Sequence, residues 1–340
     1  MDEHEEQINA LVSGINSPES WEIAKRIVSL LGDVPSYVTT AIGFLKRDLE
    51  QNANEASGDS LFCFKRMLRG PGMKAPFYYL TLTLEPDIVE QHESLSSLDL
   101  VRYYKADELI SLLSVLYLFR RISRGCDQEI WPEVANKIII GSELGAHIGR
   151  AIPKIGMSFG LMLGGIRHLA SAMFLGIDKK GFWKYSNYLR SKNIAFDLER
   201  EMRDWGCNHG QIAALLLQKL GVGATLSNAV VSAITSDLEI VDGMDDDTYR
   251  IKIAQIWLDS VLLYGKAPQM KVRGEYYPLK EALDHLLEHA ESIRQAGSRH
   301  NWLNRTKDDI TPEKTPLLFS ESVDLNRTEA VEMDMPEDFS

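Results

Sequence analysis

The sequence predicts an all-α protein: a multi-helix domain with a helical N-terminal extension and a disordered, acidic C-terminal tail. Three observations support this prediction. Apolar residues recur at helical spacing through most of the chain. Residues typical of helix starts and ends, such as Ser17-Pro18 and Gly221, flank those segments. Residues 77–84 are the one strand-like stretch, and without a partner strand we expect them to form a buried helix or an extended segment.

The segment of residues 155–169 is expected to be the central helix of the domain. It is apolar as far as Arg167 and His168, where we expect this buried helix to finish. Such a run is too short to span a bilayer. Glycines in it would let neighbouring helices approach closely; they are Gly156, Gly160, Gly164 and Gly165.

The other helices follow from their start, stop and periodicity signals. Ser17 and Pro18 have the chemistry of an N-cap and a first helical position, opening a helix that reaches Leu31 and closes at Gly32. Asn208 is a favoured N-cap for the helix that ends at Gly221. Apolar periodicity predicts further helices at residues 38–50, 62–68, 131–150, 225–234, 246–264 and 278–296. It also predicts a helical pattern from Leu109 to Phe119 within residues 94–124, and residues 181–205 carry a group of aromatic residues followed by a charged stretch.

Composition divides the chain into three regions. With 340 residues, 44% of them hydrophobic and 25% charged, it is typical of a soluble globular protein. We expect an N-terminal helical region at residues 1–93, the main helical domain at 94–300 and a tail at 301–340. From Lys307 the composition loses apolar periodicity, so we expect the tail to be disordered.

Charge and cysteine content exclude several classes of function. A net charge of -12 argues against nucleic-acid binding, which needs clustered Lys and Arg. Three widely spaced cysteines form neither a disulfide framework nor a thiolate zinc site. The acidic N-terminus is the opposite of a secretory signal. These features predict a cytoplasmic protein that binds neither nucleic acid nor membrane.

Three stretches between residues 155 and 236 occur in the order found in a known family. They are Gly165-Ile-Arg-His168-Leu169, then Glu199 followed by Gly206-Cys-Asn-His209-Gly-Gln-Ile-Ala-Ala-Leu-Leu216, then Gly221 to Ile234. This pattern resembles the HDOD family, the HD-related output domains of bacterial signalling proteins. Residues 1–90 match the family poorly. The resemblance implies an HD-like helical domain.

The resemblance also implies a metal site that this chain has lost. Catalytic HD phosphohydrolases hold a divalent ion with an early His, a His-Asp pair, further His residues and a late Asp, because such ions need several hard or imidazole ligands. In this chain Glu133 lies near the position of the early His, and Leu169 stands where the Asp of the His-Asp pair is expected. The late His pair is replaced by Ser236-Asp237-Leu238. Only His168 and His209 remain. We therefore expect no catalytic site, no bound metal and no cofactor.

Two interpretations of the remaining histidines stay open. In the first, His168 and His209 are core residues hydrogen-bonded to backbone or side chains. In the second, they join Arg167 in a pocket for a small anionic ligand.

A second histidine motif lies near the end of the helical region. His285 and His289 stand four residues apart with Glu288 between them, as in one class of zinc peptidase. Little sequence follows to supply a third ligand, so we expect an amphipathic surface helix there. Cys207 lacks the neighbouring charges that would favour a thiolate nucleophile.

The sequence thus predicts a non-catalytic, HDOD-like regulatory module that acts through signalling-protein contacts or a small anionic ligand. One alternative is an HD-type phosphohydrolase with rearranged ligands from Glu133, His168, His209 and Asp237. Another is an interaction scaffold that works through its acidic tail.

Overall fold

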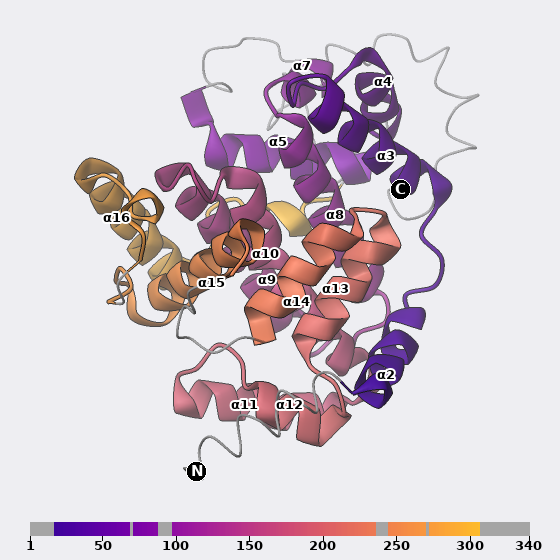
Figure 1. Ribbon diagram of the computed structural model, residues 1–340, viewed down its shortest axis with the longest axis vertical. Coiled ribbons are helices and arrows are strands. Elements are labelled where there is room, and N and C mark those ends of the chain that lie inside the picture. The colour runs from indigo at the N-terminus through magenta and orange to yellow at the C-terminus, as the bar shows by residue number, and fades with distance from the viewer. Residues whose placement is uncertain (1–16, 69–70, 88–96, 236–243, 270–271, 307–340) are drawn as a thin grey trace.

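The computed structural model describes residues 17–68, 71–87, 97–235, 244–269 and 272–306, and these ranges contain helices and no strand (Figure 1). The all-α prediction is confirmed. The α-helices are α2 (Pro18–Ser29), α3 (Ser36–Gln51), α4 (Gly58–Met67), α5 (Pro71–Leu84), α7 (Ser97–Arg102), α8 (Ala106–Ser123), α9 (Trp131–Ala151), α10 (Met157–Ile177), α11 (Lys179–Lys192), α12 (Leu198–Trp205), α13 (His209–Leu220), α14 (Ala224–Thr235), α15 (Asp246–Tyr264) and α16 (Lys280–Ala296). Two 3₁₀ turns, η1 (Gly274–Tyr276) and η2 (Trp302–Asn304), complete the set.

Several helix ends are fixed by local chemistry that the sequence predicts. Ser17 caps α2 by accepting a hydrogen bond from the Ser20 amide. Asn208 caps α13 and forms a reciprocal capping box with Gln211. Gly221 ends α13 with a left-handed φ of +82°, which favours glycine.

Helices α9 and α10 form an antiparallel central pair in close backbone contact (Figure 1). A Cβ added at Gly145 would overlap the carbonyl of Gly160, so only hydrogen fits between the two backbones. The same relation repeats along the crossing in two further pairs, Gly141 with Gly164 and Gly149 with Gly156. The predicted role of the α10 glycines in close helix packing is therefore confirmed.

Helix α10 continues well beyond the point where the sequence analysis ended it. Arg167 and His168 lie in its middle, and the helix runs to Ile177. The expected end was wrong because residues 169–177 are mostly apolar and contain no proline, so the helix continues to its C-cap at Asp178. Among the described residues, α10 is the one helix long and apolar enough to cross a membrane, and 83% of its most apolar window is buried inside the protein. It is the core helix of this fold.

The hydrophobic core is continuous across the expected region boundaries. Helix α2 packs on α13 and α3 packs on α8, so the N-terminal helices share one core with the rest.

The strand-like residues 77–84 belong to α5, which begins at Pro71 because the missing amide of proline is tolerated in a first turn.

The folded part also extends past the expected start of the tail at residue 301. Trp302 and Leu303 are buried, with exposed fractions of 0% and 1%, and the Arg305 carbonyl accepts a hydrogen bond from Arg120 at 3.0 Å. The expected boundary was wrong because these two side chains add apolar area to the core. The tail after residue 306 and Asp237 both lie outside the described residues.

Candidate functional site

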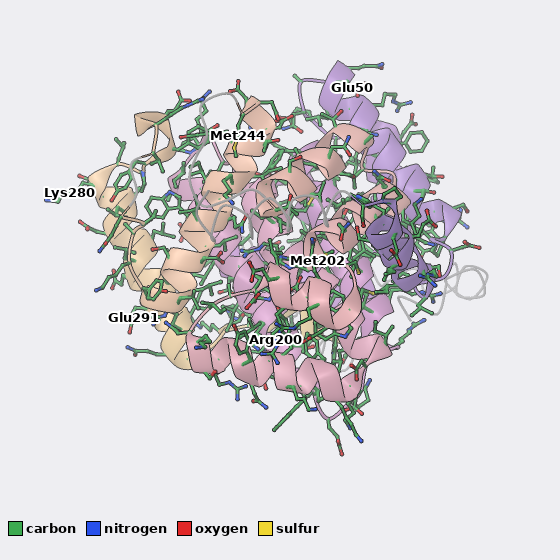
Figure 2. All side chains as sticks on the ribbon, turned by 60° about the horizontal axis from the view of Figure 1, so that its bottom comes forward. Glu50, Arg200, Met202, Met244, Lys280 and Glu291 are labelled. Carbon is green, nitrogen blue, oxygen red and sulfur yellow. The ribbon has the colours of Figure 1, made fainter. Side chains whose placement is uncertain are left out.

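A cavity of about 490 Å³ opens beside the middle of α10, and we call it the His168 cavity. Its walls come from α9, α10, α11, the residues 193–196 that follow α11, and the ends of α15 and α16. Figure 2 faces this side of the molecule, where α16 beyond Glu291 approaches α11. The volume lies within the range of about 300–1,000 Å³ common for small-molecule sites.

Cationic side chains stand at the edge of this cavity. Lys137 is half-buried and Arg190 is exposed, and each pairs with the Glu133 carboxylate, at 2.9 and 2.6 Å. Arg294 donates to Glu291 at 2.8 Å. No Asp or Glu lines the cavity itself. The three cationic side chains at the edge are thus paired with only two carboxylates, those of Glu133 and Glu291, and neither carboxylate lines the cavity.

The inner lining is apolar and aromatic, with a few hydroxyl groups. Val134, Phe182 and Tyr185 are buried and pack into the core. Ser171 and Ser186 contribute hydroxyls. An apolar interior with cations at the edge is suited to an elongated or aromatic molecule that has one anionic end.

His168 projects from α10 into this cavity. Burial lowers the pKa of its imidazole well below the ordinary value of 6.5, and the nearby charges of Arg167, Lys137 and His209 lower it further. The ring is therefore neutral at pH 7, with one nitrogen that donates and one that accepts. Such a ring can offer hydrogen bonds but no positive charge.

The ring of Phe196 brings the three expected site residues together. Its centroid lies 5.1 Å from that of His168 and 4.1 Å from that of His209. The guanidinium carbon of Arg167 lies 4.6 Å from the same centroid, in cation–π geometry. Of these three residues, only His168 lines the cavity.

Arg167 is engaged inside the protein. Its two terminal nitrogens donate to the two carboxylate oxygens of Asp259 at 2.9 and 3.0 Å, which ties α10 to α15. Arg167 is only 3% exposed. Such a two-point pair holds a guanidinium in a fixed plane. Arg167 therefore supports the Phe196 wall and does not face a ligand.

His209 is engaged with the buried carboxylate of Glu201. The ring Nδ1 lies 2.8 Å from a Glu201 oxygen, and the His209 amide donates to the same oxygen at 2.7 Å. Tyr185 donates its hydroxyl to Glu201 at 2.5 Å, and burial together with that carboxylate raises the pKa of the Tyr185 phenol. The Glu201 carboxylate thereby accepts a hydrogen bond from a backbone amide at the start of α13 that has no partner within the helix. These contacts support the interpretation of His209 as a hydrogen-bonded core residue.

The rearranged phosphohydrolase ligand set is not assembled among the described residues. Glu133 lies in surface ion pairs with Lys137 and Arg190, and His209 is bound to Glu201. Leu169, which follows His168 in α10, is fully buried in the core. Asp237 lies outside the described residues.

A different trio of metal-ligating side chains does converge within the described part of the chain. Glu143 and His147 of α9 meet His289 of α16. Glu143 and His147 are not among the site residues predicted from the sequence. Their four-residue spacing in α9 was the available signal, because residues four apart share one helical face.

The chain was compared with family models, with curated proteins and with solved structures, and none of them matches it.

Proposed function

We propose that this protein is a non-catalytic, HDOD-like regulatory module that binds a small amphipathic anion in the His168 cavity. The observation that supports this best is the lining of that cavity: an apolar interior, a neutral imidazole and three cations at its edge, with no carboxylate among the lining residues. The anionic group would lie near Lys137 and Arg190, and the apolar body would lie against Phe182 and Phe196.

The engagement of the family-like residues supports a regulatory role over a hydrolytic one. Arg167 is held by Asp259, and His209 is held by Glu201. Both side chains are buried, at 3% and 1% exposed, and neither lines the cavity, so neither is placed to bind a scissile phosphate or to transfer a proton to it. Ligand binding next to Phe196 would instead be transmitted to the α10–α15 pair and to the start of α13, since Phe196 contacts both.

A fluorescent aryl sulfonate, anilinonaphthalene sulfonate, tests the binding proposal because it combines an aromatic body with one anionic group. We expect saturable binding of one probe per folded chain. Arg190→Gln should weaken it by roughly 5- to 10-fold through loss of one charge. Ala195→Trp, which fills the cavity from its lining, should abolish it.

The matched control is Lys184→Gln, because Lys184 lies on the same helix as Arg190 but does not line the cavity. This variant should bind the probe like the parent protein. Equal binding by the parent and by Ala195→Trp, with cooperative unfolding in both, would disprove the site. Hydrolysis of cyclic dinucleotides or phosphomonoesters with added Mn²⁺ or Fe²⁺ would disprove the non-catalytic role.

A further inference from the structure

Three ligand-type side chains converge where α16 packs on α9. Glu143 and His147 stand one turn apart on α9, and His289 reaches them from α16. One donor atom from each lies within 4.8 Å of the other two. The two imidazole rings are 3.9 Å apart between centroids, and His289 Nε2 is 3.9 Å from a Glu143 oxygen.

Each of these side chains has a buried polar atom without a hydrogen-bond partner. They are Oε2 of Glu143, Nε2 of His147 and Nε2 of His289. Glu143 itself is only 1% exposed. A buried polar atom left unpaired destabilises the fold, so three such atoms in one place call for a shared partner.

A divalent cation satisfies all three atoms at once. Neutral imidazole and carboxylate are ligands of Zn²⁺ and similar first-row ions, which bond them at about 2.0–2.2 Å. Small side-chain rotations would draw the donor atoms inward around an ion.

The trio borders an open cavity of about 600 Å³. His147 and His289 line it, together with His285, Glu288 and Arg150. Three protein ligands next to open space is the pattern of a zinc site that keeps one coordination position for water or another ligand.

We propose that Glu143, His147 and His289 form a binding site for one divalent transition-metal ion of the Zn²⁺ class, with its fourth coordination position facing the cavity between α9 and α16. The site is separate from the His168 cavity, and the proposal does not depend on the anion-binding function. It also revises the expectation for the His285–His289 motif: only His289 of that motif is a ligand, and the other two ligands, Glu143 and His147, come from α9 upstream.

The test uses the untagged 340-residue chain, stripped with a chelator and titrated with Co²⁺ and Zn²⁺. We expect one ion per chain, a Kd for Zn²⁺ of about 1 μM or tighter, and the visible absorption of low-coordinate Co²⁺. Zn²⁺ should also raise the melting temperature, because it binds only the folded state.

The deciding variant is His289→Gln, whose parent side chain is 39% exposed and which should therefore fold. It should weaken Zn²⁺ binding by about 100-fold or more, as should His147→Gln. The matched control, His285→Gln, removes an exposed imidazole one turn away on the same helix and should bind Zn²⁺ within about 3-fold of the parent. The proposal is overturned if the parent shows no saturable binding, if His289→Gln binds like the parent, or if His285→Gln is weakened as much as His289→Gln.

Discussion

The rings of Phe196 and His209 lie 4.1 Å apart between centroids, with only 24° between their planes. Phe196 comes from the short connection between α11 and α12, and His209 is the first residue of α13. One aromatic ring therefore separates a buried histidine–carboxylate pair from the His168 cavity.

Replacing Phe196 tests this separation. Phe196→Ala should lower the free energy of unfolding by about 2 kcal/mol, less than for a fully buried phenylalanine, because Phe196 is partly exposed. Urea denaturation measures the change. The control is Trp183→Ala on α11, whose parent residue is 57% exposed and which should cost less than about 0.5 kcal/mol. Equal losses in the two variants would show that the Phe196 stacking contributes nothing.

The Arg167–Asp259 pair should show strong energetic coupling. Asp259→Ala leaves a buried guanidinium without its partner and should cost about 2–3 kcal/mol, since Asp259 is itself a quarter exposed. The double variant Arg167→Met with Asp259→Ala should lose less than the sum of the single variants. We expect a coupling free energy of roughly 1–3 kcal/mol from a double-mutant cycle.

The exposed pair Arg47–Asp59 provides the comparison for that cycle. Its coupling should be close to the error of the measurement, because water screens both groups. A similar coupling in both pairs would contradict the view that Arg167 and Asp259 fasten α10 to α15.

The glycine contacts between α9 and α10 should be intolerant of a single methyl group. Gly145→Ala places its Cβ against the Gly160 carbonyl, so the helices must separate, and we expect a loss of about 3 kcal/mol or more. Gly43→Ala is the control, since Gly43 lies inside α3 with nothing within 4 Å of an added Cβ. That variant should gain about 0.5–1 kcal/mol from helix propensity. Thermal unfolding measures the stability of both variants. If Gly145→Ala is as stable as the parent protein, the close crossing of α9 and α10 is refuted.

Stability should fall as the pH drops below neutrality. The pKa of His168 in the folded state lies well below 6.5, its ordinary value, so the unfolded chain binds a proton first as the pH falls. Stability is therefore fully present above pH 6.5 and is lost below it. This residue should account for about 1 kcal/mol between pH 6.5 and 5.5. His168→Asn should remove that part of the pH dependence in urea denaturation with chelator present, and an unchanged pH dependence would contradict the assignment.

Helix positions were predictable because their signals are local. A side chain that caps a helix acts within three residues, as Ser17 does for Ser20 and Asn208 for Gln211. The end of α10 was missed for a related reason. The charge of Arg167 suggests a helix end, but a charged residue does not by itself end a helix. Its partner Asp259 is remote in the sequence, so the sequence gives no sign of their pairing.

By itself the sequence determined that the chain is helical, where most helices begin and end, and that the α10 glycines pack closely. The tertiary structure alone decided that Arg167 and His209 are engaged inside the protein while His168 borders a cavity, and that Glu143 and His147 meet His289. The physical reason is range. Capping and periodicity involve neighbours within one helical turn. Which residues share a cavity depends instead on how the helices cross, and close backbone contacts such as that of Gly145 with Gly160 fix those crossings.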